Sequence, residues 1–170
     1  MTINWAGMPL FSGLGPEDIT LVQKLFKPVS LDKGCVVIAE NSEGNEMFIL
    51  VKGRVKVTKS MLLADISIPI PGLENSRKVL ACLDSSQFPF FGEMALLDKD
   101  VRSATVETTE ASQFLKTNRA RFFALVNEHP TVGVQLLNNL GRLLAHHIRK
   151  GNREQVKLTT ALALALSRRG

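Results

Sequence analysis

The sequence is notable for what it contains little of: long apolar runs, cysteine and histidine. No run of about 18 apolar residues is present, which argues against a transmembrane helix. Met1–Leu10 contains neither a basic region nor a continuous apolar stretch, so no cleaved secretory signal is expected. Hydrophobic residues make up 45% of the 170 residues and charged residues 22%, which predicts one globular domain with its own core.

The scarcity of cysteine and histidine limits the chemistry. Cys35 and Cys82 each lie in an apolar, strand-like run, so we expect reduced core residues and a cytoplasmic protein. The three histidines are His129, His146 and His147, whereas a metal-dependent oxygenase needs converging histidines and a carboxylate. Adjacent histidines on a helix point about 100° apart. We therefore expect no enzyme, no bound metal and no cofactor.

The excess of positive charge lies at one end of the chain. The 21 Lys and Arg residues against 16 Asp and Glu give +5, with a pI near 9.5. The segment Arg142–Gly170 holds seven basic residues and one acid, so it carries +6 and residues 1–141 carry −1. The charge that would suggest a nucleic acid or membrane partner therefore belongs to a C-terminal segment and not to the body.

A short helix followed by many short strands is predicted for the first two thirds of the chain. Pro16 suits the first position of a helix within Pro9–Lys27, with Ile19 and Val22 on its apolar face. Eight apolar runs follow, separated by turn residues. They are Val29–Leu31, Cys35–Glu40, Glu46–Val51, Arg54–Lys59, Leu63–Ile68, Lys78–Leu83, Ser103–Glu107 and Ser112–Lys116. This pattern predicts a mainly β fold with flanking helices, a jelly-roll-like antiparallel β-barrel.

The remaining residues are predicted to be helical. Arg119–Glu128 forms one helix that stops near His129-Pro130, and a longer helix begins at about Thr131. Gly151-Asn152 should weaken or end it, and the apolar run Leu158–Ser167 is too short to cross a bilayer. One side of the long helix has coiled-coil spacing: Val134, Leu137, Leu140 or Gly141, Leu144 and Ile148. This stripe could pack on its own barrel or form a dimer contact, and the two are compatible.

The segment Phe91–Val106 carries the chemistry. Gly92 is expected to turn the chain into a short helix, whose unpaired N–H groups favour an anion. Arg102 is expected at the start of the next strand, and its guanidinium matches two phosphate oxygens. Glu93 could accept hydroxyl protons from a sugar, and Ser103 adds a neutral donor or acceptor. The alternative is that Glu93 and Arg102 merely form an ion pair across a loop.

The same segment resembles the phosphate-binding cassette of the cyclic nucleotide-binding domain family, which includes catabolite activator proteins, kinase regulatory subunits and gated channels. The matching residues are Phe91-Gly92-Glu93-Met94-Ala95-Leu96 and Arg102-Ser103-Ala104-Thr105-Val106. The resemblance extends over about residues 9–150. Val101 replaces the usual proline, and Asn41 and Asn45 stand where Gly and Asp are common.

The resemblance implies a ligand site. Glu93 would receive the ribose 2′-hydroxyl, Arg102 would hold the cyclic phosphate, and backbone around Gly92, Met94, Ala95 and Ser103 would complete the cradle. In the family the purine is capped from the long helix. The candidates here are either His147 and Ile148 or Gly151 and Asn152, depending on whether one helical turn is inserted. Ser103 is similar to both cAMP- and cGMP-binding members, and cAMP is favoured on family frequency alone.

These features predict a regulatory module that couples a cyclic nucleotide to movement of the C-terminal helix. Residues 1–130 would form the binding barrel, and residues 131–170 would form the lid, the homodimer contact and the basic tail. The alternative is a degenerate member that acts only in dimerisation or protein interaction. No winged helix-turn-helix pattern follows the long helix, so direct sequence-specific DNA binding is not expected. The stretch Ser60–Arg77 is longer than a minimal hairpin and has no predicted function.

Overall fold

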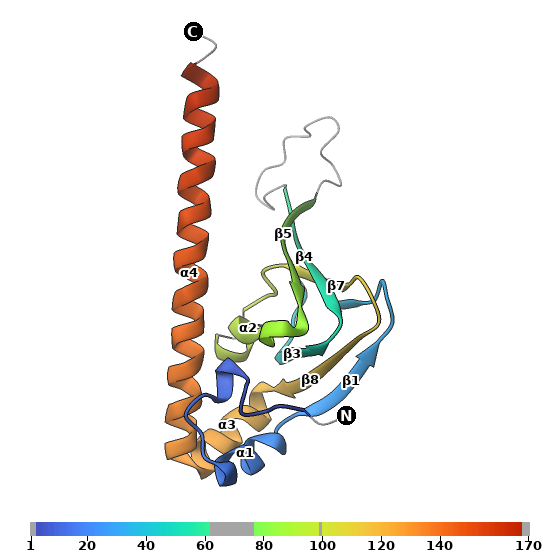
Figure 1. Cartoon of the computed structure of the whole chain (residues 1–170), viewed down its shortest axis with the longest axis vertical. Coiled ribbons are helices and arrows are strands. Elements are labelled where there is room, and N and C mark those ends of the chain that lie inside the picture. Colours follow the sequence, from blue (N-terminus) through green and yellow to red (C-terminus); the bar gives the residue numbers. More distant parts are fainter. Residues whose placement is uncertain (1–2, 62–76, 99, 168–170) are drawn as a thin grey trace.

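The computed structural model describes residues 3–61, 77–98 and 100–167, and it confirms the predicted antiparallel β fold (Figure 1). Two four-stranded sheets have the orders β1-β8-β3-β6 and β2-β7-β4-β5. Their strands are β1 (Lys27–Leu31), β2 (Val36–Ile38), β3 (Glu46–Lys52), β4 (Arg54–Ser60), β5 (Arg77–Asp84), β6 (Phe90–Phe91), β7 (Thr105–Thr108) and β8 (Ser112–Asn118). The predicted strand Leu63–Ile68 lies outside the described residues.

Aromatic residues fill the space between the two sheets. Phe114 of β8 is fully buried and meets Phe48 of β3 and Phe91 of β6 edge-on, with ring centroids 6.3 and 6.0 Å away. Phe48 and Phe91 stack on each other at 6.3 Å. Leu50 and Val55 complete this cluster from the β3–β4 hairpin. Because side chains alternate between the two faces of a strand, these short runs can each supply one face to the core.

Helices α1 and α3 and the start of α4 gather at one end of the barrel around a second core, and α4 continues past the sheets (Figure 1). The described helices are η1 (Pro9–Phe11), α1 (Pro16–Gln23), η2 (Ser85–Gln87), α2 (Glu93–Leu97), α3 (Arg119–Glu128) and α4 (Pro130–Ser167). Pro16 occupies the first turn of α1, and Val22 is fully buried, as predicted. The side-chain amide of Asn139 donates to the carbonyls of Leu10 and Ser12, at 3.0 and 2.7 Å, which fastens η1 to α4.

The α4 stripe is shared between the chain's own core and the outer face of the helix, since its members Leu137 and Leu144 are partly buried against that core. Leu136 and Leu140 are buried against the chain's own core. Val134 is 59% exposed and Ile148 63%, and a Cβ added to Gly141 would meet open space. The spacing of three and four therefore continues through Gly141 on the outer face, while Leu140 belongs to the inner one.

Gly151-Asn152 was predicted to weaken or end the helix, and the predicted end is wrong, since α4 runs unbroken from Pro130 to Ser167. A glycine within a helix costs only about 1 kcal/mol. Good helix formers follow it, and Lys157 bridges Glu154 at 2.7 Å one turn apart. None of the described helices is long and apolar enough to cross a membrane.

The prediction that both cysteines are core residues is also wrong. Cys35 is only partly buried and Cys82 is exposed, and both are free thiols. Cys82 lies on β5, an edge strand paired only with β4 in its sheet. Most of β5, including Leu80, is exposed. An apolar sequence run therefore did not indicate burial at this edge.

Leu50 and Leu80 provide a matched test of the core. Leu50→Ala should lower the free energy of unfolding by about 2–5 kcal/mol, because Leu50 is fully buried and its loss leaves a cavity. Leu80→Ala should change it by less than about 1 kcal/mol, because Leu80 is 51% exposed. Urea unfolding followed by circular dichroism measures both. Equal losses for the two variants would contradict this placement of the core.

Candidate functional site

Gly92 creates the turn on which the site is built. Its φ of 86° lies in the left-handed region, and α2 begins at the next residue, as predicted. A Cβ at this position would stand 2.5 Å from the carbonyl oxygen of Glu46 and 2.7 Å from Nη1 of Arg102. Only glycine therefore allows the turn after β6 to approach both the start of β3 and the Arg102 guanidinium so closely.

Arg102 is held in a nearly closed backbone cage. The residue is 5% exposed, and its Nη1 donates to the carbonyls of Glu46 and Gly92 at 2.8 and 3.2 Å. Its backbone N–H donates to Ser42 O, and its carbonyl accepts from Asn41 N–H. The strand predicted to begin at Ser103 starts only at Thr105, so Arg102 lies in a loop rather than at a strand start. Hydrogen bonds to the loop Asn41–Asn45 position it instead.

The same loop presses directly on the guanidinium of Arg102. A Cβ on Gly44 would lie 2.6 Å from Nη2 and 2.7 Å from Nε of Arg102. Burial lowers the pKa of Arg102, while the carboxylates of Glu46 and Glu93 raise it. An arginine keeps its proton in proteins, so a fixed cation lies beneath α2.

Glu93 is the first residue of α2 and is partly buried. Burial raises the pKa of its carboxyl, and a hydrogen bond to its own backbone and the charge of Arg102 oppose that rise. Among the described residues, no ion pair joins Glu93 to Arg102. Two complementary charged groups thus lie near each other without neutralising each other through a direct contact, an arrangement that can bind a ligand with both an anion and hydroxyl groups.

The other predicted cradle residues have different surroundings. Ala95 is buried, Met94 is 49% exposed, and the Ser103 hydroxyl lies 3.8 Å from Sδ of Met94. The Ser103 carbonyl accepts a hydrogen bond from Nζ of Lys59, at 3.0 Å. Lys59 comes from β4 and was not predicted, because only the β4–β7 pairing brings it to the end of the cassette.

Another group that the sequence analysis missed ties β5 to the cassette. Nη2 of Arg77 donates to Oε2 of Glu40 and to Oγ1 of Thr105, each at 2.7 Å. The Thr105 hydroxyl also accepts from the Glu40 backbone N–H at 3.1 Å. No spacing rule could have found this cluster, because its members lie 28 to 65 residues apart in sequence.

Of the four candidates for capping a base, His147 contacts the strand that leads into the cassette. Its ring stacks on Phe90 of β6 with centroids 5.8 Å apart. His147 is an exposed residue, but partial burial of its ring, together with the charges of His146 and Lys150, lowers its pKa. Ile148, Gly151 and Asn152 are exposed, with no hydrogen bond, ion pair or ring contact to the barrel among the described residues.

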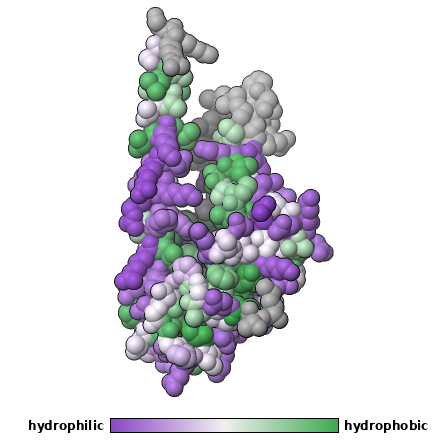
Figure 2. Space-filling view, viewed as in Figure 1, coloured by the Kyte–Doolittle hydropathy of each residue, from purple (hydrophilic) through white to green (hydrophobic). Residues whose placement is uncertain are grey.

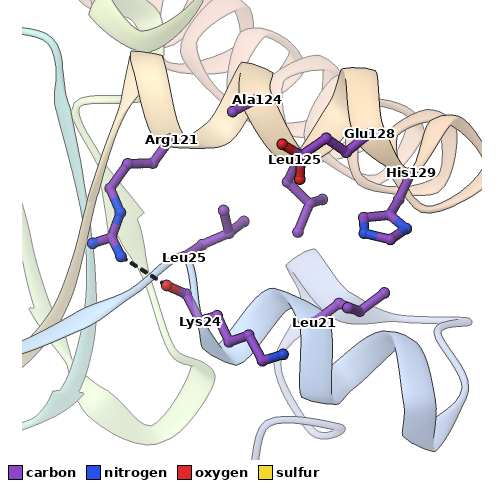
Figure 3. A pocket seen from close by; sticks show the side chains of 8 residues that line it. All are labelled: Leu21, Lys24, Leu25, Arg121, Ala124, Leu125, Glu128 and His129. Atoms are coloured by element: carbon purple, nitrogen blue, oxygen red, sulfur yellow. Dashed lines mark hydrogen bonds between the residues drawn. The ribbon is translucent and has the colours of Figure 1, made fainter.

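A surface pocket of about 320 Å³ lies elsewhere, between α1 and α3 (Figure 3). Its lining residues are Leu21, Lys24, Leu25, Arg121, Ala124, Leu125, Glu128 and His129, none of which belongs to the cassette. In the figure the leucine side chains point between the two helices, and Arg121 donates to the Lys24 carbonyl at 2.9 Å. Within the described ranges, no group of three or more His, Cys, Asp or Glu side chains could hold a metal ion.

Comparison with known families and sequences agrees with this geometry. The family model described as "Cyclic nucleotide-binding domain" matches residues 28–129, more than half of the chain. The cyclic AMP receptor protein of Thermus thermophilus is 28% identical over 148 residues, which cover 87% of this chain and 61% of the relative. Human cGMP-dependent protein kinase 2 is 36% identical over 96 residues, covering 56% of this chain and 11% of the kinase. The chain thus spans less than two thirds of these relatives.

Solved structures show the same fold. The crystal structure of the Thermus thermophilus catabolite activator protein has a TM-score of 0.72 at 27% identity, covering 89% of this chain and 63% of that one. A cyclic nucleotide-binding domain from Methylobacillus flagellatus has a TM-score of 0.70 at 21% identity, covering 82% of this chain and 71% of that one.

The raised pKa of Glu93 predicts a pH-dependent stability. Because the folded state binds this proton more tightly than the unfolded state, the group's ionisation costs stability at neutral pH. The cost disappears as pH falls through the raised pKa towards the ordinary glutamate value of about 4.3. Without nucleotide, Glu93→Gln should therefore be more stable than the parent at pH 7, and the difference should shrink on acidification. Urea unfolding across this pH range measures the effect.

Glu107→Gln is the control for this prediction. Glu107 is a surface carboxylate whose side chain is 37% exposed, 3.7 Å from Nζ of Lys56. Its replacement should not increase stability at pH 7. A Glu93→Gln variant that is no more stable than the parent at that pH would contradict a buried carboxylate at this position.

Proposed function

Because the chain belongs to the cyclic nucleotide-binding domain family, we propose that it is a regulatory module whose cassette binds a cyclic nucleotide, cAMP in preference to cGMP. The observation that carries the proposal is the buried, prepositioned guanidinium of Arg102 near the Glu93 carboxylate, with which it forms no ion pair among the described residues. Relatives with named ligands include both a cyclic AMP receptor and a cGMP-dependent kinase. The longer match, over 148 residues against 96, is to the cyclic AMP receptor, which supports cAMP.

Two charged groups of the cassette would bind different parts of the nucleotide. Among the described residues, Nη1 of Arg102 bonds two carbonyls, while Nε and Nη2, which lie against Gly44, donate no hydrogen bond and are the donors left for the cyclic phosphate. Glu93 would accept the ribose 2′-hydroxyl, and backbone near Gly92, Met94, Ala95 and Ser103 would complete the cradle. The carboxylate already bears the cost of partial burial, and a bound hydroxyl would offset it.

Residues 131–170 would act as lid and dimer contact, with residues 1–130 as the binding part. A nucleotide can drive such a movement only if it binds one arrangement of α4 more tightly than another. His147 on Phe90 is the best-placed of the predicted base-capping residues, since it already touches β6. The nucleotide base would then either replace the contact between the His147 and Phe90 rings or make a further contact beside it.

The outer face of α4 would join two copies of the chain. Val134, Leu137, Gly141, Leu144 and Ile148 repeat with coiled-coil spacing, and the two end members are largely exposed. Exposed apolar residues continue along the part of α4 that projects past the barrel (Figure 2). Burying this stripe in a homodimer would remove apolar surface that a monomer leaves in water.

Titration calorimetry with cAMP and cGMP tests the binding proposal. The parent should bind, with the tighter affinity for cAMP, and Arg102→Ala should weaken binding by about 30-fold or more, because removing one member of a buried charged contact typically costs at least 2 kcal/mol. Arg54→Ala removes an exposed arginine at the start of β4 and should bind as the parent does.

The degenerate alternative makes the opposite prediction in the same experiment. It requires that neither nucleotide gives heat with the parent, and that parent and Arg102→Ala show no nucleotide-dependent change in melting temperature. That result would leave the chain as a dimerisation or protein-interaction domain. Circular dichroism of Arg102→Ala is needed alongside, because Arg102 also bonds two backbone carbonyls.

Sedimentation velocity tests the dimer. Ile148→Glu should convert a dimeric parent to monomer, because it would place two like charges in one apolar layer. Val156→Glu is the matched control: Val156 is similarly exposed, on the same helix, but outside the repeat. A monomeric parent, or loss of the dimer in both variants alike, would contradict the proposed seam.

A further inference from the structure

We propose that Arg119 is the positioning residue through which the cassette is coupled to α3 and α4; this inference rests on the proposed nucleotide binding. Arg119 lies outside the cassette, at the first position of α3. Its Nη1 donates to two backbone carbonyls, those of Leu96 and Leu97. These are the last two residues of α2, where carbonyls lack partners within the helix and a cation is favourable. The guanidinium therefore fixes the end of α2 opposite Glu93.

The backbone of Arg119 bonds to the loop on the other side of the candidate site. Its N–H donates to the carbonyl of Asn45 at 2.8 Å. Asn45 ends the loop whose Gly44 packs on the Arg102 guanidinium and whose Ser42 carbonyl accepts the Arg102 N–H. One residue thus bonds both to the helix that carries Glu93 and to the loop that confines Arg102. A ligand that brings α2 and this loop closer together must therefore change the hydrogen bonds of Arg119.

Arg119 also contacts the helical part of the molecule. Its guanidinium lies 4.8 Å from the ring centroid of Phe123, one turn along α3. Phe123 meets Phe122 edge-on at 5.4 Å, and Phe122 is buried in the core that contains Leu136 of α4. A single residue, His129, separates α3 from α4, and its carbonyl accepts the N–H of Gly133. A shift at the start of α3 is therefore conveyed to the start of α4.

Arg121 offers a closely matched control. It lies two residues further along the same first turn of α3 and carries the same charge, and its Nη2 donates to a backbone carbonyl. That carbonyl belongs to Lys24 (Figure 3), which lines the α1–α3 pocket and not the cassette. Arg119→Gln and Arg121→Gln thus remove the same charge and the same kind of bond, but only the first touches the cradle.

Hydrogen–deuterium exchange with and without saturating cAMP tests the coupling, with cGMP run in parallel. In the parent, nucleotide should protect both the cassette around residues 92–97 and the α3–α4 region around residues 119–140. In Arg119→Gln, cassette protection should remain and α3–α4 protection should be lost, while Arg121→Gln should keep both. A residue that merely stabilised the fold would instead lower the melting temperature without separating the two regions.

Three results would overturn the proposal: α3–α4 protection that persists in Arg119→Gln, equal loss in Arg121→Gln, or a parent in which bound nucleotide protects only the cassette. If Arg119→Gln does not fold, Arg119→Lys carries the test. Lysine keeps the charge but lacks the planar fork that spans two carbonyls and stacks on Phe123, so the same selective loss is expected. A parent that gives no binding heat with either nucleotide refutes the proposed function itself, which separates that failure from a failure of coupling.

Discussion

Burial of the Arg102 guanidinium is the constraint on which the rest of the site depends. A cation removed from water is costly unless its N–H groups find acceptors. Here the acceptors are backbone carbonyls of Glu46 and Gly92, which only a left-handed glycine and a side-chain-free Gly44 allow to approach. This one charge is contacted by the turn into α2 and by the loop of residues 41–45, and the Glu93 carboxylate lies near it.

The described part of the chain has two cores, and the candidate site lies between them. One core lies between the sheets and centres on Phe114, and the other lies among the helices and includes Phe122 and Leu136. The cassette sits at their junction, because β6 belongs to a sheet while Leu96 packs with the helices. A ligand at such a junction can influence the helices only through the groups that cross it, which gives Arg119 and the His147–Phe90 stack their significance.

Local patterns predicted the elements well and burial less well. The start of α1 at Pro16, the break between α3 and α4 and the Gly92 turn follow from proline and glycine chemistry, which acts within a few residues. The cysteines were misplaced because strand-like apolar runs do not reveal which strand lies at a sheet edge. The helix through Gly151 was predicted to weaken or stop because one unfavourable residue was given more weight than the many helix formers around it.

The sequence by itself determined the cassette: the order Gly92, Glu93 and Arg102 is local, and its match to a known family names a ligand class. Only the tertiary structure decided what surrounds that cassette. Gly44, Lys59, Arg77 and Arg119 come from four other segments, and the pairing of antiparallel strands and the packing of α3 bring them to it. Such contacts have no sequence period, because they depend on which distant surfaces exclude water together. The few long apolar runs noted at the outset are consistent with this: many short segments, rather than one long one, build both the core and the site.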